Sequence, residues 1–329
     1  MSGHSRAPLA ARSDGARAVI DAHRFLLTFM SLVLSGIALV AGGHVALARK
    51  GLLPPPPLAA TSCIDSKFSA LRDAPLADRT LVAVGSSATW RNLDIPVLET
   101  RLPGTRGFNA APCYLYIDQT DHLTAFLLSR MPEVTTVVTV VAPRDFESCV
   151  PEERAFFDTS LAEAYLDRQV PHWLPYITGF RPAYLAREFL ARKARMPADA
   201  QDPLGSSILR RPHSWRPAPA FDARCYSALT ELEATVTSHG ARLVVAPLPI
   251  MPEWAAQFDP DGSLIKSWTG AIRAALIQPE TVIADGTALQ WDDTRFADPV
   301  HLLYPHHTPF TGFIADAIAR HARNQQAGS

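Results

Sequence analysis

The stretch Leu81-Val82-Ala83-Val84-Gly85-Ser86-Ser87 decides the fold. Its four apolar residues run directly into a glycine and two serines, a pattern typical of a short buried strand that ends at a turn. In open α/β sheets, ligands bind outside the carboxyl ends of the strands. A serine that follows such a strand is a candidate nucleophile, and we take Ser87 as that candidate.

The rest of the chain alternates between strand-like and helix-like patterns. Stretches with β-strand character occupy five ranges, 80–84, 106–110, 134–142, 242–247 and 281–285. Helical patterns accompany them at 63–71, 95–100, 118–130, 221–239, 263–276 and 311–320. Because strands that alternate with helices favour a parallel sheet, we expect an α/β fold, a three-layer sandwich with a mainly parallel five-stranded sheet.

The composition sets limits on the function. The chain has 329 residues, of which 47% are hydrophobic and 19% charged, enough for one large α/β domain with a sizeable core. Its formal net charge is −1, so basic residues are not in surplus. A dedicated nucleic-acid-binding protein needs such a surplus, and we therefore expect no nucleic-acid partner.

An apolar segment near the N-terminus is long enough to span a membrane. Phe25 to Ala48 is 24 residues without an acidic or basic side chain, apart from His44. As a helix it would extend roughly 36 Å, against about 30 Å for a bilayer core. Four arginines precede it, so positive-inside reasoning places the N-terminus in the cytoplasm and the main domain outside, in the periplasm.

Two other interpretations of this segment stay open. Ala46-Leu47-Ala48 resembles a cleavage site, which would make the segment a long signal peptide. Burial as a core helix is the second interpretation, although the segment is apolar on nearly all sides. We favour a retained single-pass anchor because of the length of the segment.

The patterns divide the chain into five parts. In order, these are a disordered cytoplasmic tail, a transmembrane helix, a proline-rich spacer, an α/β domain and a second disordered tail, at 1–24, 25–48, 49–62, 63–323 and 324–329. Pro54–Pro57 favour a stiff polyproline spacer that lifts the domain off the membrane. Within the domain, 151–223 interrupts the alternation with aromatic-rich stretches, which predicts a helical insertion with helices at 152–169 and 182–196.

Four cysteines, Cys63, Cys113, Cys149 and Cys225, fit an exported protein. An even number in an oxidising compartment allows two disulfides with three alternative pairings. Cys113 and Cys149 each follow a predicted strand, so we favour Cys113–Cys149, which leaves Cys63–Cys225. Four free thiols are the alternative. No Cys-x-x-Cys pair is present, and we expect neither a metal site nor a cofactor.

The chain supplies a base for Ser87 near its C-terminus. A serine hydroxyl is a poor nucleophile unless an imidazole accepts its proton and a carboxylate holds that imidazole. Asp298-Pro299-Val300-His301 follows the last predicted strand, so it too lies at a C-terminal sheet edge. On a turn, this spacing lets Asp298 bond one ring nitrogen of His301 while the other nitrogen faces Ser87. We therefore predict a Ser87–His301–Asp298 triad.

Each motif also has a plainer interpretation. Gly-Ser-Ser occurs in ordinary turns, and a second copy, Gly205-Ser206-Ser207, follows Asp202-Pro203 rather than an apolar strand. Asp-x-x-His is common in surface turns, and His306 and His307 are best explained as solvated or packing residues. A Gly-Ser-Ser turn could also bind phosphate, but the glycines and lysine of a P-loop are missing. The order and positions of the two motifs favour catalysis.

The two motifs resemble those of the SGNH/GDSL hydrolase superfamily. Its Gly-Asp-Ser turn after the first strand is matched by Gly85-Ser86-Ser87, and its C-terminal Asp-x-x-His is matched by 298–301. The resemblance covers about residues 78–320 without the insertion, and it implies an SGNH hydrolase-like, flavodoxin-like fold. The Gly-Ser-Ser variant is similar to membrane-anchored members that handle acyl groups on envelope polymers, such as D-alanyl transfer and alginate acetylation proteins.

The resemblance also implies an oxyanion site. Family members carry Asn-x-Gly-x-x-Gly after the second strand, and here Tyr114 falls near the glycine whose backbone N–H donates to the oxyanion. Gly-x-Asn-Asp after the third strand becomes Ala142-Pro143-Arg144-Asp145, with Arg144 in place of the asparagine. The oxyanion candidates are therefore Ser87, Tyr114 and Arg144. The alternative is that Arg144 or Asp145 forms a salt bridge to the insertion.

By this resemblance, we expect a membrane-anchored, extracytoplasmic serine esterase or O-acyltransferase. Its substrate would be an acyl ester of envelope polysaccharide, a related glycan or a small ester, and a membrane protein could supply the acyl groups. The alternative is a catalytically degenerate domain that binds glycan or serves as a scaffold subunit of an envelope-polymer complex. The missing oxyanion asparagine favours the alternative, whereas the intact serine, histidine and aspartate favour the enzyme.

Overall fold

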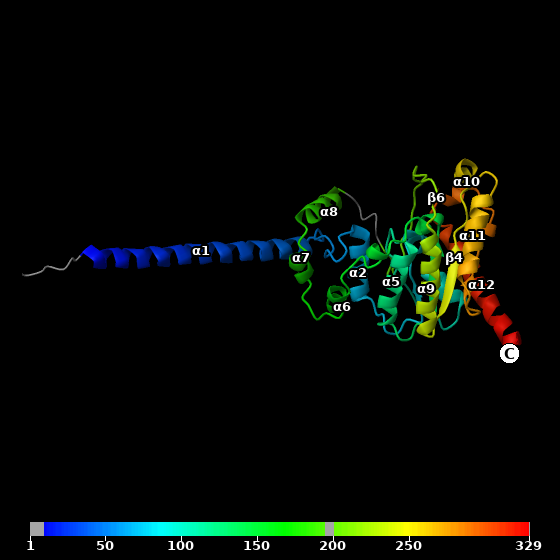
Figure 1. Ribbon diagram of the computed structural model, residues 1–329, viewed down its shortest axis with the longest axis horizontal. Coiled ribbons are helices and arrows are strands. Elements are labelled where there is room, and N and C mark those ends of the chain that lie inside the picture. The colour runs from blue at the N-terminus through cyan, green and yellow to red at the C-terminus, as the bar shows by residue number, and fades with distance from the viewer. Residues whose placement is uncertain (1–9, 195–200, 329) are drawn as a thin grey trace, which may run out of the picture. The chain divides into compact units, whose positions relative to one another are not determined.

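The computed structural model describes residues 10–194 and 201–328 (Figure 1). The chain forms two compact units. The first contains the N-terminal residues up to Pro54 together with Phe189–Ala194, and the second contains Pro55–Glu188 and the described residues from 201 onward. The sheet and both predicted site motifs belong to the second unit.

A long helix, α1 (Ala10–Arg49), accounts for most of the first unit. Its stretch Asp21–Arg49 is long and apolar enough to cross a membrane, and none of its apolar window is buried. This exposure argues against a core helix and leaves an anchor or a signal sequence. Residues 10–24, predicted as a disordered tail, are helical instead, because their alanines and arginines favour helix. Residues 1–9 lie outside the described residues.

The second unit contains the predicted α/β fold. Among its described residues, five strands form the sheet: β1 (Leu81–Ala83), β2 (Gly107–Asn109), β3 (Thr136–Val141), β4 (Arg242–Pro247) and β5 (Val282–Ile283). Their order is β2-β1-β3-β4-β5, and every neighbouring pair is parallel, which confirms the predicted sheet. In this order, the direction of winding changes between β1 and β3, and ligands of such folds bind at that switch point.

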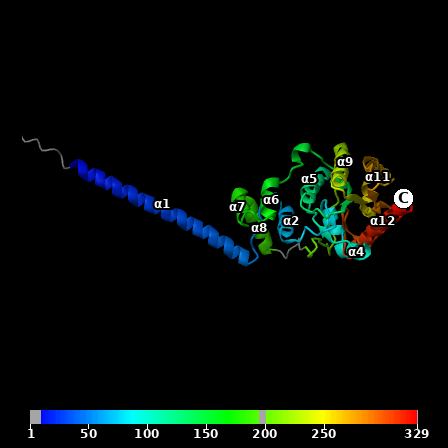
Figure 2. The same ribbon diagram turned by 90° about the horizontal axis from the view of Figure 1, so that it is seen from below.

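Helices cover both faces of the sheet and give the predicted three layers (Figure 2). One face carries α2 (Ser62–Asp73), α5 (Ile117–Leu128), α9 (Ala223–Ser238) and α11 (Ser263–Ala275). The other carries α3 (Ser87–Asn92), α4 (Ile95–Arg101), α10 (Pro252–Phe258) and α12 (His307–Gly328). Side chains along a strand point alternately to the two faces of a sheet. Accordingly, Val82 of β1 packs in the apolar cluster on the first face, while Leu81 and Ala83 pack in the cluster on the second.

The C-terminal tail differs from its prediction. Residues 324–328 continue α12 to Gly328 rather than forming a disordered tail, and Ser329 lies outside the described residues. The helix persists because its last turns contain alanine and glutamine, which favour helix.

The insertion is helical, but with shorter elements than predicted. It contains a 3₁₀ turn at Pro151–Glu153 and the helices α6 (Thr159–Leu166), α7 (Leu174–Thr178) and α8 (Pro182–Ala194). The continuous helix predicted at 152–169 is therefore wrong, because Asp158 caps a new helix in its middle by accepting a hydrogen bond from Leu161 N. The predicted end of the last helix, residue 196, lies outside the described residues.

The proline-rich segment was predicted to be a stiff spacer outside the domain, but its prolines from Pro55 onward belong to the second unit. Pro55–Pro57 are buried, and Leu58 belongs to the apolar cluster beneath the sheet. Consecutive prolines are stiff and carry no N–H, so they can lie against an apolar surface without leaving a donor unsatisfied. The domain therefore begins at Pro55, ahead of the predicted boundary at residue 63.

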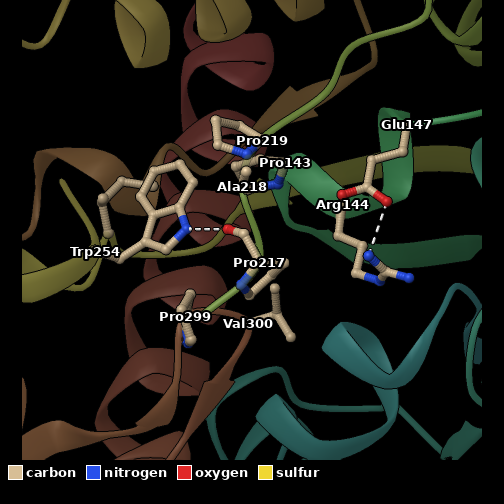
Figure 3. Close-up of a pocket in the computed structure, with 10 residues that line it drawn as sticks. Pro143, Arg144, Glu147, Pro217, Ala218, Pro219, Trp254, Pro299 and Val300 are labelled. Carbon is tan, nitrogen blue, oxygen red and sulfur yellow. Dashed lines mark hydrogen bonds and ion pairs between the residues drawn. The ribbon is translucent and has the colours of Figure 1, made fainter. Parts of the chain in front are cut away.

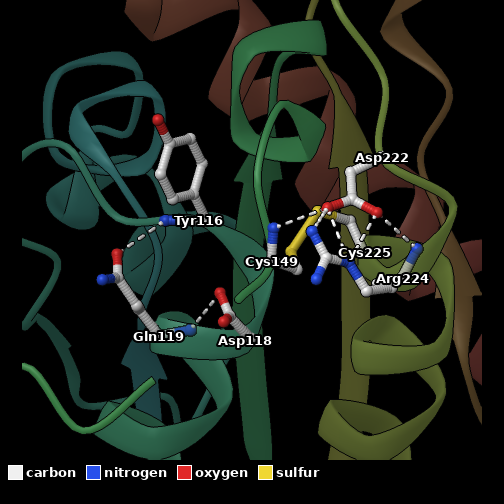
Figure 4. Close-up of a disulfide and its surroundings, with 7 residues drawn as sticks. All are labelled: Tyr116, Asp118, Gln119, Cys149, Asp222, Arg224 and Cys225. Atoms are coloured by element: carbon white, nitrogen blue, oxygen red, sulfur yellow. Dashed lines mark hydrogen bonds and ion pairs between the residues drawn. A yellow bond between two sulfur atoms is a disulfide. The ribbon is translucent and has the colours of Figure 1, made fainter. Parts of the chain in front are cut away.

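The structure contains two disulfides, but the predicted pairing is wrong. Cys63 pairs with Cys113 and Cys149 pairs with Cys225, with Cα–Cα distances of 5.9 and 5.2 Å, rather than Cys113–Cys149 and Cys63–Cys225. The reason is the strand order. β1 lies between β2 and β3, which separates the loops that contain Cys113 and Cys149. Figure 4 shows Cys149 beside the start of α9, where Asp222 accepts a hydrogen bond from Cys149 N at 3.2 Å.

Candidate functional site

The two serines after β1 have different surroundings. Ser86 is buried, caps α3 by accepting a hydrogen bond from Ala88 N at 3.1 Å, and also bonds to the buried Asp145 after β3. Ser87 is the first residue of α3, is partly exposed, and its hydroxyl has no hydrogen-bond partner among the described residues. Ser86 therefore has a structural role, and Ser87 presents the available hydroxyl.

Gly85 is required at this turn. Its φ of +140° is rarely accessible to other residues, and an added Cβ would overlap Thr89 Oγ1 and lie 3.0 Å from Thr139 Oγ1. The tight packing fixes the direction in which the chain leaves β1. Ser87 consequently lies at the carboxyl edge of the sheet, as the sequence predicted, and begins α3, a helix that was not predicted.

The predicted aspartate and histidine are in contact. They lie on a hairpin formed by β6 (Phe296–Asp298) and β7 (His301–Leu302). His301 Nδ1 lies 2.9 and 2.8 Å from the two oxygens of Asp298, and Asp298 Oδ1 also accepts a hydrogen bond from Val300 N at 3.0 Å. Asp298 is almost fully buried. The hairpin thus orients the imidazole, as a carboxylate does in a catalytic triad.

The electrostatics of this pair favour an ionised carboxylate. Burial by itself would raise the pKa of Asp298, but the hydrogen bond and the positive charge of His301 outweigh it and lower this pKa below its ordinary value. With Asp298 ionised, Nδ1 of His301 donates its hydrogen to the carboxylate. The lone pair on Nε2 is then the basic site of the ring.

His301 Nε2 is buried and has no hydrogen-bond partner among the residues described. Ser87 Oγ therefore does not form the predicted hydrogen bond to this nitrogen here. Such bonds are often long in the absence of substrate and tighten when it binds. The unpaired nitrogen is the acceptor that a serine hydroxyl would need.

Asn92 connects the serine helix to the histidine hairpin. Its side chain donates to Val300 O at 3.0 Å and accepts from Leu302 N at 2.7 Å, so it binds both neighbours of His301. Asn92 ends α3, the six-residue helix that begins at Ser87 and rises about 7.5 Å between these two residues. The fold therefore joins α3, which begins at Ser87, to the hairpin that contains His301, from opposite ends of the domain.

A shallow apolar pocket lies beside the hairpin turn (Figure 3). Pro299 and Val300 form one wall and Pro143 and Arg144, just after β3, form another. Trp254 and the segment 217–219 complete it, and Trp254 Nε1 donates to Pro217 O at 2.7 Å. The hollow is shallow and opens to solvent, and the 320 Å³ of free space within it includes solvent outside its mouth. It lies outside the carboxyl edge of the sheet, where this fold class binds ligands.

The three predicted oxyanion residues differ in exposure and in what their donor groups contact. Arg144 lies on the pocket wall, but its guanidinium binds Glu147 at 2.8 Å and lies over the Trp215 ring, 5.1 Å from its centroid. Tyr114 is 72% exposed with a φ of +58°, the backbone conformation that glycine would adopt at this position. The amide N–H groups of Ser87 and Tyr114 have no partner among the described residues, so both remain possible donors.

Sequence reasoning missed two residues of this site. His213 Nδ1 lies 3.4 Å from Asp298 Oδ2, and His213 N donates to Ala297 O, so a second imidazole flanks the carboxylate. Asp145 bonds Ser86 across the switch point between β1 and β3 and accepts from Ala142 N at 2.8 Å. His213 lies in an irregular segment without a pattern that would single it out.

A buried polar network supports α3 from below. Asn109 Nδ2 lies 3.2 Å from Thr89 O and from Trp90 O, both acceptors in α3. Lys67, almost fully buried, donates to Asn109 O at 2.9 Å and to Gly205 O at 2.6 Å. Burial lowers the pKa of Lys67 well below its ordinary value. The second Gly-Ser-Ser copy thus belongs to the structural support of the serine helix.

No group of three or more potential metal ligands occurs within the described residues. His307 is buried, and its Nε2 lies 3.8 Å from Asp94 Oδ2. Burial lowers the pKa of His307. It packs at the start of α12, whereas His306 is partly exposed.

The chain matches no family model, and a search of curated proteins finds no match. What can be said of its chemistry therefore depends on its own residues.

Proposed function

We propose that the chain is a serine esterase or O-acyltransferase of SGNH type that acts outside the cytoplasm. One observation carries the proposal. His301 is held by the ionised Asp298 at Nδ1 and leaves Nε2 unpaired, on a hairpin that Asn92 ties to the helix beginning at Ser87. A base oriented by a carboxylate near an available serine is the arrangement that nucleophilic acyl transfer needs.

The proposed reaction has two halves. In the first, Ser87 Oγ bonds to the acyl carbon while His301 Nε2 takes its proton; the ester C–O bond then breaks, and His301 returns that proton to the leaving alkoxide. In the second, water or a sugar hydroxyl attacks the acyl-serine, and His301 again accepts and returns the proton. Asp298 keeps the ring oriented and stabilises its protonated form.

Stabilising the oxyanion is the least conventional part of the proposed mechanism. The free amide N–H groups of Ser87 and Tyr114 are the candidate backbone donors, and Arg144 is the candidate side chain. Arg144 would have to leave Glu147 to reach an oxyanion. The apolar pocket beside Pro299 and Val300 would accept the acyl group or part of the alcohol.

The location follows from the N-terminal helix and the disulfides. A helix able to span a membrane and two disulfides both favour an extracytoplasmic domain. An anchored domain suits a substrate that stays at the envelope, such as an acylated polysaccharide or a related glycan. A membrane protein that supplies acyl groups would be its partner in the transfer reaction.

A second candidate function is a catalytically degenerate domain that binds glycan or serves as a scaffold. Two observations favour it: Ser87 and His301 are not hydrogen-bonded, and Arg144 is engaged by Glu147. Such a domain would keep the pocket but turn over no ester.

Hydrolysis of p-nitrophenyl acetate by the full chain distinguishes the two functions. The enzyme should release nitrophenol and become labelled at Ser87 by a fluorophosphonate, and Ser87→Ala should abolish both. If the wild type is folded and shows neither turnover nor label, the catalytic proposal fails.

A further inference from the structure

An exposed apolar patch lies on the insertion. Trp173, Ile177 and Phe180, at 47, 61 and 67% exposure, are three of the eight exposed large apolar residues outside α1 among those described. Trp173, the N-cap of α7, and Ile177 are one helical turn apart, and Phe180 follows Gly179, the residue that ends this helix. Most exposed apolar residues occur singly on a protein surface, whereas these three are clustered.

The opposite side of α7 is packed into the domain. Pro175 and Tyr176, between the exposed residues, are both buried. Just beyond α7, Tyr184 OH donates to Asp65 Oδ2 at 2.7 Å, while Asp65 Oδ1 accepts from Ala59 N at 2.7 Å. The patch is therefore fixed to α2 and to the residues with which the chain enters this domain.

Gly179 brings the patch directly against the entering chain. A Cβ at Gly179 would lie 2.9 Å from Pro57 O and 3.0 Å from Pro175 O, so the approach of the two segments depends on the absence of a side chain. Pro57 is eight residues after Arg49, the last residue of α1. Even fully extended, eight residues span at most about 29 Å.

We propose that Trp173, Ile177 and Phe180 insert into the outer interface of the membrane that holds α1. The short connection keeps this patch within reach of the bilayer surface. Tryptophan and phenylalanine are the side chains that favour the boundary between headgroups and acyl chains. The exposed Arg181, next to Phe180, adds a cation suited to lipid phosphates. Two attachments, the helix and the patch, would fix the face that the domain turns to the membrane.

Tryptophan fluorescence can test this contact in the full chain. α1 contains no tryptophan, so all six residues of this type report on the folded domain. The chain is reconstituted into phosphatidylcholine vesicles, with or without bromine on the upper acyl carbons, which quenches only fluorophores in contact with lipid. We expect bromolipid quenching in the wild type and its loss in Trp173→Phe.

Two further variants provide matched controls. Trp215→Phe removes another exposed tryptophan, 41% accessible, and should keep the bromolipid quenching. The double variant Ile177→Ser, Phe180→Ser keeps Trp173 as a reporter and should reduce its quenching, since both changed side chains are exposed. Vesicle flotation shows in each case that the chain is membrane-bound.

Several results would overturn the proposal. Equal fluorescence of the floating wild type in both lipids would place the patch away from the bilayer, and concentration-dependent cross-linking through it would then assign it to a second copy of the chain. Quenching lost in Trp215→Phe but kept in Trp173→Phe would place a different face on the lipid. If the wild type does not float with the vesicles, the membrane does not hold the chain through α1. None of these results depends on esterase activity.

Discussion

His301 Nδ1 lies 2.9 and 2.8 Å from the two carboxylate oxygens of Asp298, while Nε2 of the same ring is buried and has no hydrogen-bond partner in the described part of the chain. The Nε2 atoms of His122, His239 and His321 are also buried without a partner among the described residues, so the contact with Asp298 is what distinguishes His301 from them. The pair is therefore more informative than the short Asp-x-x-His motif alone. It leads to predictions that separate catalytic from structural residues.

The first prediction concerns the two copies of Gly-Ser-Ser. Ser87→Ala should remove fluorophosphonate labelling and reduce kcat for p-nitrophenyl acetate by about a thousandfold or more, because the nucleophile is lost. Ser207→Ala is the matched control, since Ser207 occupies the same place in the second copy but is buried. Peptide mapping should find the label on Ser87. Labelling of the Ser207 peptide instead would contradict the assignment.

The second prediction concerns the carboxylate between two imidazoles. Asp298→Asn should lower kcat by about 10⁴, because an amide cannot hold His301 in the required tautomer. His213→Ala should cost only a few-fold, since His213 lies 3.4 Å away and is half exposed. Circular dichroism checks that both variants fold. Equal losses in the two variants would contradict the proposed division of roles.

The third prediction concerns Arg144. If its guanidinium contributes to the oxyanion site, Arg144→Ala should lower kcat by about a hundredfold with little change in KM. Glu147→Gln breaks the same ion pair but keeps the guanidinium, so it should retain or increase kcat. Equal losses in the two variants would show that only the ion pair matters, and Arg144 would then be a structural residue.

The fourth prediction concerns the disulfides. Mapping under non-reducing conditions should recover linked peptides for Cys63–Cys113 and for Cys149–Cys225. Cys225→Ala should lower the free energy of unfolding by about 2–5 kcal/mol, measured by urea titration, because it opens a long closed loop. A linked Cys113–Cys149 peptide from the unreduced wild type would contradict the structure.

The sheet could be predicted because each strand is a short apolar run with its own turn signal. β4 matches its predicted range, 242–247, at both ends, and the other four strands begin or end within a few residues of theirs. Ser87 could be located because it follows a strand of the parallel sheet, whereas the Asp-x-x-His motif, which lies on the separate β6–β7 hairpin, was recognised by its spacing. These signals are local in the sequence. The rule that ligands of open α/β sheets bind outside the carboxyl ends of the strands then predicts where such residues lie in the fold.

The remaining features depend on contacts between distant segments. The disulfide pairing required the order β2-β1-β3, which no local pattern encodes. His213 approaches Asp298 from an irregular segment, where its N–H donates to Ala297 O and its own carbonyl accepts from Arg216. Pro55–Pro57 are buried, and Pro57 lies against Gly179 of the insertion, more than 100 residues later. Propensity alone predicted a stiff spacer.

The last prediction concerns the pH dependence of stability. Burial raises the pKa of Asp145 from 3.8 to about 7, although hydrogen bonds from Ser86 and Ala142 and the charge of Arg144 oppose the shift. A raised folded-state pKa means that the neutral form is the one the fold favours. The contribution of Asp145 to stability is therefore fully present below about pH 4 and is lost as the pH rises towards 7.

Asp145→Asn should remove this dependence, because an amide keeps the acceptor for Ala142 N and never ionises. In urea titrations, the stability of this variant relative to the wild type should increase between pH 4 and pH 7 and stay constant above that range. Asp65→Asn is the comparison: burial raises the pKa of Asp65 to about 6, so its relative gain should level off about one pH unit earlier. A difference between Asp145→Asn and the wild type that does not change with pH would show that the carboxyl between Ser86 and Ala142 titrates normally. In that case, burial at the switch point would not control the ionisation of Asp145.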